Sequence, residues 1–270
     1  MSRSFRVAVT TLPGWLDVAR LLGPGEWVDE GAGPVAELEK AEAADLCARL
    51  RGVTIGGVVL EVTVWPSLPR AAVREGRTQE ARRQRHRSVG FSHPRARCRE
   101  GGRLGLTPES LALEFALRQP PQRVLDACCG CGGDTVAFAR AGHQVVAVDT
   151  DLQRLDDAAH NVALYGVGHL TQLRHGNAEQ VVGDQDADLL YLDPPWTDLG
   201  LLDRVCARWD RYRQVVLKVP AQFDPTSLPD FSVEAVFGDA PGDTQRVKFL
   251  RLTRLARATA PLLPTGHSDR

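Results

Sequence analysis

The chain has 270 residues, of which 43% are hydrophobic and 25% charged, and its formal net charge is −1. This length suits one large α/β domain with a smaller appended module, and the composition is that of a folded globular protein. No apolar run approaches the roughly 20 residues that span a bilayer, and no signal peptide is evident, so we expect a cytoplasmic protein without a membrane partner.

Residues 1–73 are expected to form a small α+β module, whose role the sequence leaves open. Residues 5–22 resemble a strand, a Pro-Gly turn and a helix. Residues 33–52 are helical in their second half, with Gly52 as a candidate C-cap, and residues 53–66 are rich in valine and predict one or two strands.

Residues 74–103 carry most of the charge asymmetry. Ten arginines and three glutamates give this segment a net charge of +7, so the remainder of the chain carries −8. Few apolar residues and no clear period predict a linker or a loop-rich arm. Arginine binds phosphate bidentately, which favours RNA as a partner, although a solvated basic linker is the alternative. The candidate RNA-binding residues are Arg82, Arg83, Arg85 and Arg87.

Residues 104–270 are expected to form an α/β domain. Thr107 and Pro108 have the residue types favoured at a helix N-cap and first helical position. From Arg123 onward strands alternate with helices, which predicts a mostly parallel sheet covered on both faces. The last two strands, within 231–238 and 244–253, lack a crossover helix and should pair antiparallel. In one helix the expected apolar face consists of Leu152, Leu155, Ala159 and Val162.

The first motif that indicates chemistry is VLDACCGCGGDTVAFA, residues 124–139. A predicted strand ends at Asp126, and a turn with Gly130, Gly132 and Gly133 opens a helix. Glycine lets the backbone approach a ligand closely, and a helix N-terminus offers free N–H groups. The spacing is not G-x-G-x-x-G, which argues against a dinucleotide-binding fingerprint. The three cysteines in four positions suit neither a disulfide framework nor a zinc site, so we expect free thiols and no metal.

Asp149 ends the next predicted strand, where an acidic residue can accept hydrogen bonds from two ribose hydroxyls. Asn177 follows the third strand and is a candidate for hydrogen bonding to an adenine amino group. A glycine loop beside an acidic strand end suits an adenosyl cofactor without phosphates. We therefore expect S-adenosyl-L-methionine, with S-adenosyl-L-homocysteine as the product.

The fourth strand ends in the sequence DPPW, residues 193–196. Asp193 and the carbonyl of Pro194 can accept hydrogen bonds from an amino group on a planar ring, and the two prolines make these acceptors rigid. Positioning of this kind lowers the barrier to transfer without a strong base. Trp196 offers a ring on which a base can stack. The predicted catalytic residues are Asp193, Pro194, Pro195 and Trp196, and Trp196 is also a predicted substrate contact.

These motifs resemble those of class I S-adenosylmethionine-dependent methyltransferases, and in particular the trimethylguanosine synthase family of RNA cap guanine-N2 methyltransferases. The match consists of the TPE helix start, the D-x-x-C-G-x-G-G loop, the D-x-D strand end and a P-P-W motif. The resemblance implies that Thr107, Pro108 and Glu109 line the cofactor pocket, and that Pro194, Pro195 and Trp196 form a guanine pocket. The predicted cofactor-binding residues are Thr107, Pro108, Asp126, Cys129, Gly130, Gly132, Gly133, Asp149, Thr150, Asn177 and Ala178.

Two positions depart from the family pattern. Asp193 replaces the family serine, as in adenine-N6 methyltransferases and ribosomal-RNA guanine-N2 enzymes, and Thr197 and Asp198 replace two glycines. The expected fold is a Rossmann-like class I methyltransferase with a seven-stranded, mostly parallel sheet and a closing antiparallel hairpin. The expected activity is N-methylation of an exocyclic amino group of a nucleobase, guanine N2 in RNA being favoured. A small-molecule amine and adenine N6 are the alternative targets.

Overall fold

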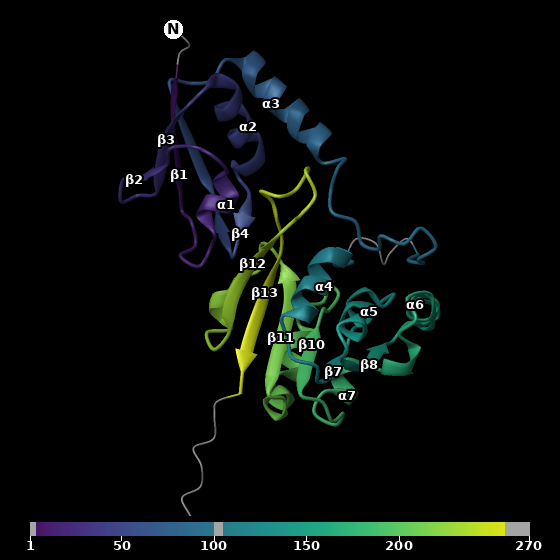
Figure 1. The fold of residues 1–270 in the computed structure, drawn as a ribbon. Helices are drawn as coiled ribbons and strands as arrows, with labels where there is room; N and C mark the ends of the chain where they lie inside the picture. The colour runs from purple at the N-terminus through teal and green to yellow at the C-terminus, as the bar shows by residue number, and fades with distance from the viewer. Residues whose placement is uncertain (1–3, 100–104, 257–270) are drawn as a thin grey trace, which may run out of the picture.

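Seven strands form the sheet of the larger lobe in the computed structural model, which describes residues 4–99 and 105–256 (Figure 1). Five neighbouring strands, namely β9, β8, β7, β10 and β11, run parallel. Strand β13 is antiparallel to both β11 and β12. This arrangement confirms the predicted Rossmann-like sheet with its closing antiparallel pair. In spatial order the strands are β12 (Ser232–Phe237), β13 (Val247–Leu255), β11 (Gln214–Pro220), β10 (Leu189–Leu192), β7 (Arg123–Asp126), β8 (Gln144–Asp149) and β9 (Thr171–His175).

Helices cover both faces of this sheet, which explains why β10 and β11 are buried along their whole length. Alternate residues point to opposite faces, so Leu190 and Leu217 belong to one apolar cluster and Leu189 and Val216 to the other. The first cluster includes side chains of α7 (Ala178–Val181), α8 (Leu201–Val205) and the 3-10 helix η2 (Cys206–Arg211). The second includes side chains of α4 (Glu109–Leu117), α5 (Gly133–Arg140) and α6 (Leu152–Leu164). Two further 3-10 turns are η1 (Gly168–Leu170) and η3 (Pro225–Ser227).

The N-terminal lobe has a separate antiparallel sheet in the order β2-β3-β1-β6. This confirms the predicted α+β module. Its strands are β1 (Phe5–Thr10), β2 (Val28–Asp29), β3 (Pro34–Leu38) and β6 (Glu61–Trp65), with β4 (Thr54–Ile55) and β5 (Val58–Val59) as a separate pair. Its helices are α1 (Val18–Leu22), α2 (Lys40–Leu50) and α3 (Arg70–Arg83). Among residues 4–99 and 105–256, no helix has both the length and the apolar character needed to cross a membrane.

The structure differs from the expected linker between Arg74 and Arg83, because these residues belong to helix α3. This helix packs against α2 through Gly76 and Glu80, which are both buried. A contact face built from a glycine and a glutamate lacks the apolar periodicity that indicates a helix, which is why the sequence pattern missed it. Within the expected arm, residues 84–99 lack helix and strand. Residues 100–103 of the arm lie outside the described part of the chain.

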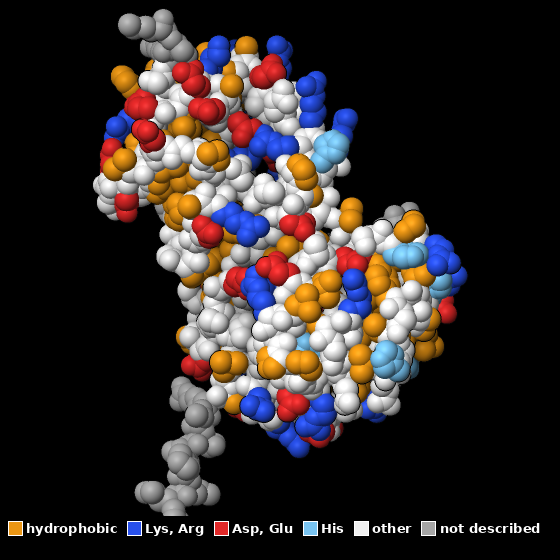
Figure 2. Space-filling view, viewed as in Figure 1, with side chains coloured by type: hydrophobic (Ala, Val, Ile, Leu, Met, Phe, Trp, Pro, Cys, Tyr) orange, Lys and Arg blue, Asp and Glu red, His pale blue; other side chains and the backbone are white. Residues whose placement is uncertain are grey.

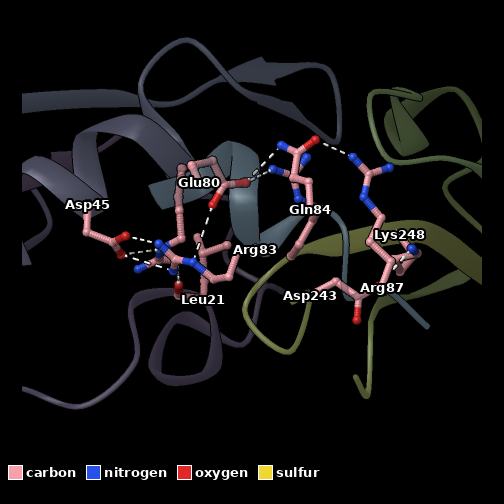
Figure 3. Close-up of polar contacts among 10 residues, drawn as sticks. Leu21, Asp45, Glu80, Arg83, Gln84, Arg87, Asp243 and Lys248 are labelled. Atoms are coloured by element: carbon pink, nitrogen blue, oxygen red, sulfur yellow. Dashed lines mark hydrogen bonds and ion pairs between the residues drawn. The ribbon is translucent and has the colours of Figure 1, made fainter. Parts of the chain in front are cut away.

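Polar contacts join α3 to the loop between β12 and β13, residues 238–246 (Figure 3). Glu80 accepts a hydrogen bond from Gln84 (2.9 Å) and forms an ion pair with Arg246 of the loop. Asp243 is buried in this loop, where it accepts hydrogen bonds from the Ser88 backbone N–H (3.0 Å) and hydroxyl (2.8 Å). These contacts fix the N-terminal lobe on the larger one.

The N-terminal lobe lies at the edge of the large sheet where the parallel strands end (Figure 1). The backbone N–H groups of Gly56 and Gly57 donate to the carbonyls of Ala221 (2.8 Å) and Gln222 (3.2 Å), immediately after β11. In sheets of this kind the carboxyl ends of the strands are where ligands bind. The small lobe is therefore placed beside the region in which a ligand site is expected.

Residues 88–99, here called the tether, follow α3 and pack on α6. The side chain of Asn161 accepts from the Arg97 N–H (2.8 Å) and donates to the Arg97 carbonyl (2.7 Å). Asp157 accepts from the Arg99 N–H (3.1 Å). The apolar face predicted for this helix was therefore wrong in part. The buried residues are Leu155, Asp157, Ala158, Asn161 and Val162, whereas Leu152 and Ala159 are exposed.

The close approach of α2 and α3 predicts an unusual response to alanine at Gly76. A β-carbon there would overlap the carbonyl oxygen of Ala44. Alanine normally stabilises a helix by about 0.5–1 kcal/mol relative to glycine. Here we expect Gly76→Ala to lower the free energy of unfolding by about 1–3 kcal/mol, because the helices must separate.

Thermal or urea unfolding measures this effect, and Arg77→Ala is the matched control on the exposed side of the same helix. A Gly76→Ala protein as stable as the wild type would show that the two helices do not meet as described.

Candidate functional site

A cavity of about 500 Å³ opens at the carboxyl ends of β7, β8 and β10. Most of the residues predicted from the motifs line it, although they come from separate parts of the sequence. The predicted residues on its walls are Cys129, Gly130, Gly133, Asp149, Thr150, Asn177, Ala178, Asp193, Pro194, Pro195 and Trp196. Another hollow, of about 970 Å³, runs along α2 and α3 and lies away from these strand ends. We therefore take the strand-end cavity as the candidate site.

The glycine loop forms one wall of the cavity. Gly130 and Gly132 have φ angles of +54° and +83°, in the left-handed region that favours glycine. A β-carbon on Gly132 would lie 3.1 Å from the Ala158 side chain, so this glycine allows the turn to pack on α6. Gly132 does not line the cavity. Its role is to shape the loop that Gly130 and Gly133 present to a ligand.

Asp149 is buried at the end of β8 and is tied to the same loop. Its Oδ2 accepts from the Gly130 N–H (2.9 Å) and its Oδ1 from the Asp151 N–H (2.9 Å). The guanidinium of Arg154 lies 4.0 Å away. Each carboxylate oxygen retains a second lone pair, and the residue lines the cavity. Asp149 can therefore accept hydrogen bonds from a pair of hydroxyl groups, as predicted for a ribose.

Three predicted cofactor residues lie behind the walls of the cavity. Asp126 is fully buried and accepts a hydrogen bond from Thr135 (2.6 Å), and burial raises its pKa well above the usual range, with Asp134 adding to the effect. Thr107 is buried and donates to the carboxylate of Asp134 (2.8 Å). Pro108, rather than Thr107, is the N-cap of α4. These residues reach the site only through their neighbours.

Asp134 lines the cavity and was missed by the sequence reasoning. The signal was present, because an acidic residue directly follows the glycines at the start of α5. Asn177 lines the cavity but is also the N-cap of α7, where its side-chain oxygen accepts from the Glu179 N–H (2.9 Å). The oxygen expected to contact an adenine amino group is thus already engaged once.

The DPPW residues form the opposite wall of the cavity. Asp193 follows β10, and its side chain is 17% exposed. Burial raises the pKa of Asp193 to about 6, and Asp134 adds to the rise, whereas Lys218 and a hydrogen bond from Trp196 oppose it. Trp196 is 38% exposed, so much of its ring is accessible. A carboxylate and an accessible aromatic ring therefore stand side by side on one wall.

Lys218 contacts Asp193 of the DPPW motif and Arg204 contacts Asp198, two residues after the motif, and neither was predicted as a site residue. Lys218 comes from β11, and its ammonium donates to Asp193 Oδ2 (2.6 Å). Arg204 lies on the rim of the cavity, where it bridges Glu179 of α7 (2.8 Å) and Asp198 (2.7 Å). The signal for Lys218 was a lysine inside an otherwise apolar strand.

The predicted RNA-binding arginines do not line the cavity, and they fall into two groups. Arg83 forms an ion pair with Asp45, and Arg87 donates to Gln84 within its own segment. Arg82, Arg85 and Arg87 are exposed, whereas Arg83 is half-buried. Figure 2 shows basic side chains along the outer edge of α3. The exposed arginines are the ones placed to meet a phosphate.

Residues 121–204 match the family model of RNA cap guanine-N2 methyltransferases. This range contains the glycine loop, Asp149 and the DPPW motif. The match confirms the predicted resemblance to class I S-adenosylmethionine-dependent methyltransferases and to this family.

Curated relatives agree with this match over part of their length. The trimethylguanosine synthase of Saccharomyces cerevisiae is 31% identical over 101 residues, which are 34% of this chain and 32% of that protein. A 23S rRNA (uracil(1939)-C(5))-methyltransferase of Shewanella is 32% identical over 94 residues, which are 35% of this chain and 18% of that protein. The chain thus spans a third or less of the length of these two relatives.

Among solved structures, a precorrin-6y C5,15-methyltransferase from Geobacter metallireducens superposes with a TM-score of 0.48 at 14% identity. The superposition covers 64% of this chain and all of that one.

The residues of the methyltransferase-like cavity suit an adenosyl ligand with a positive charge. Asp134, Asp149 and Asp193 place three carboxylates on its walls, and the Arg154 guanidinium lies 4.0 Å from Asp149. Carboxylates in a partly buried cavity favour a sulfonium and an ammonium group over a phosphate. Within the described part of the chain, no group of three or more His, Cys, Asp or Glu side chains is arranged to hold a metal ion.

The geometry of Asp149 predicts that Asp149→Asn weakens binding of S-adenosylhomocysteine by about 10–100-fold, since charge-assisted hydrogen bonds contribute about 1.5–3 kcal/mol each. The amide also disturbs the Gly130 contact. Calorimetric titration measures the affinity. Asp156→Asn on the solvent side of α6 is the control, because its side chain is 63% exposed. Equal affinities for the two variants would remove Asp149 from the cofactor site.

Proposed function

We propose that this protein is an S-adenosylmethionine-dependent N-methyltransferase that modifies an exocyclic amino group of a nucleobase in RNA, with guanine N2 as the favoured target. The observation that carries the proposal is the pairing of Asp193 with the accessible Trp196 on the wall facing Asp149 and the glycine loop. The matching family model and the Shewanella 23S rRNA methyltransferase are both named for methylation of RNA, which supports RNA as the substrate class.

The cofactor is proposed to lie against the glycine loop, with Asp149 on its ribose hydroxyls and Asn177 and Ala178 beside its base. When bound, it supplies an electrophilic methyl group on a sulfonium. The carboxylates of Asp134 and Asp149 suit that cation better than they suit the phosphates of a dinucleotide. The residues present therefore fit this cofactor.

Asp193 is proposed to accept one N–H of the substrate amine and the carbonyl of Pro194 the other. These two acceptors lie next to each other in a segment made rigid by two prolines. They hold the nitrogen so that its lone pair points away from them, into the cavity. As the nitrogen gains a bond it becomes cationic, and the adjacent carboxylate stabilises that charge. With a pKa of about 6, Asp193 can also receive the proton that the methylated nitrogen releases.

Two matched acceptors favour an amino nitrogen over a ring carbon as the methyl acceptor. The 23S rRNA relative is named for methylation of a different atom, uracil C5. A carbon nucleophile has no N–H pair for Asp193 and Pro194 to hold. Trp196 supplies stacking of about 1–3 kcal/mol for a base, without selecting which base.

A methyl-transfer assay with radiolabelled cofactor tests the proposal directly, using RNA, DNA and a small-molecule extract in parallel. We expect label in RNA, recovered as N2-methylguanosine after nucleoside mass spectrometry. Label recovered as N6-methyladenosine would reassign the base, and label only in small molecules would contradict RNA as the substrate.

Asp193→Ala is expected to lower the turnover number by about 100-fold or more, because it removes the acceptor for the developing charge. Affinity for S-adenosylhomocysteine should stay nearly unchanged. Asp203→Ala on α8 is the control, since this exposed residue does not line the cavity. A variant that retains turnover without the Asp193 carboxylate would contradict the mechanism.

The two groups of arginines predict different effects on RNA binding. Removing Arg82 and Arg85 together should reduce the slope of log affinity against log salt by about 1–2, because each phosphate contact contributes about one unit. Arg83→Ala should instead lower the melting temperature, because it breaks the ion pair with Asp45. Fluorescence anisotropy at several salt concentrations, with melting curves for each variant, separates the two. An unchanged slope in the double variant would exclude this surface from RNA binding.

A further inference from the structure

Lys218 is an ionisable residue in an apolar place. It lies in β11, whose residues are all buried, and the lysine itself is 1% exposed. Taking an ammonium out of water costs several kcal/mol unless close partners compensate. A buried lysine is thus expected to have a specific partner.

The partners of Lys218 lie on two separate segments. Its ammonium donates to Asp193 Oδ2 (2.6 Å) and to the backbone carbonyl of Gly105. The rings of Phe249 and Trp196 lie beside it, with centroids at 5.3 and 5.8 Å. Lys218 does not line the cavity. It therefore stands behind Asp193, on the side away from a bound substrate.

These contacts constrain the Asp193 carboxylate. One oxygen is held by an ammonium whose own position is fixed by a backbone carbonyl, so the side chain has little freedom to rotate. The remaining lone pairs are left for a group in the cavity. A carboxylate held in this way loses less conformational entropy when it meets a substrate amine.

The other ionisable groups that influence Asp193 are acidic side chains, so Lys218 has a second effect. Asp134 at the start of α5 raises the pKa of Asp193. Asp126 at the end of β7 has its own pKa raised by Asp193. The neutral Cys128 and Tyr191 also lie close enough for their pKa values to be raised by Asp193. Lys218 has the opposite effect, because its positive charge lowers the pKa of Asp193.

We propose that Lys218 is a positioning residue for methyl transfer, which holds the Asp193 carboxylate in one orientation and keeps it in its acceptor form. The proposal rests on the function proposed above for Asp193. It differs from a purely structural role, in which Lys218 would only join Gly105 to the sheet. A structural role affects stability, whereas a positioning role also changes how turnover depends on pH.

The test uses Lys218→Gln, which keeps a donor for Gly105 but removes the charge, together with Lys218→Arg, which keeps the charge. Lys248→Gln is the matched control, because that lysine pairs with the buried carboxylate of Asp243 (2.8 Å) outside the cavity. Turnover number and KM are measured from pH 5 to 9, with the affinity for S-adenosylhomocysteine and the melting temperature.

For Lys218→Gln we expect the turnover number to fall by about 10–100-fold, the size typical of losing a residue that orients a catalytic group. The acidic limb of the pH profile should shift to higher pH than in the wild type, because Asp193 without Lys218 holds its proton to a higher pH. Cofactor affinity should be kept, and Lys218→Arg should restore part of the turnover. Lys248→Gln should lower only the melting temperature. A wild-type pH profile and turnover in Lys218→Gln would overturn the proposal.

A second measurement does not depend on activity. In protein labelled with 13C-aspartate, the carboxyl resonance of Asp193 is assigned by its loss in Asp193→Asn and titrated in the wild type and in Lys218→Gln. We expect a higher midpoint in the variant, and equal midpoints would contradict the proposal. If the wild type transfers no methyl group to any substrate, the proposed function fails, while this titration still tests the link between Lys218 and Asp193.

Discussion

Three carboxylates at the ends of neighbouring parallel strands determine the character of this molecule. Asp126 and Asp149 end β7 and β8, and Asp193 directly follows β10, at one edge of the sheet where each carboxylate would be costly to bury alone. Each has a different solution. A threonine hydroxyl donates to the first, two backbone N–H groups to the second and an ammonium to the third. In the proposed mechanism these partners decide which carboxylate is structural, which accepts from hydroxyl groups and which accepts from an amine.

The same partners connect the site to the rest of the fold. One N–H that stabilises Asp149 belongs to Gly130, so the shape of the glycine loop and the position of the Asp149 carboxylate depend on each other. The ammonium beside Asp193 comes from β11, the strand after which the N-terminal lobe makes its backbone contacts. The proposed cofactor side, the proposed substrate side and the small lobe therefore share one sheet edge, and a change in strand register would disturb all three.

Sequence patterns predicted what depends on strand ends and turns. Parallel strands bring their carboxyl ends together, so the glycine loop, Asp149 and DPPW could be assigned to one site without coordinates. The patterns did not predict Lys218, because a lysine in an apolar strand has no local partner and its carboxylate lies 25 residues away in the chain. They also misjudged α3 and part of α6. Both helices use polar residues, Glu80 in one and Asp157 and Asn161 in the other, for contacts that are normally apolar.

The polar contacts between α6 and the tether, which the predicted apolar face missed, have a consequence for dividing the protein into smaller units. One amide, that of Asn161, donates to the carbonyl of Arg97 in the tether and to that of Cys131 in the glycine loop (2.7 and 2.9 Å). Cys131 in turn contacts Cys98 through their sulfur atoms (2.7 Å). Cutting the chain after the tether would leave Asn161 and Asp157 buried without their hydrogen bonds to Arg97 and Arg99. The C-terminal lobe, although it contains every wall of the cavity, is thus not a self-sufficient unit, and an engineered minimal domain has to begin upstream of residue 88 to retain an intact loop.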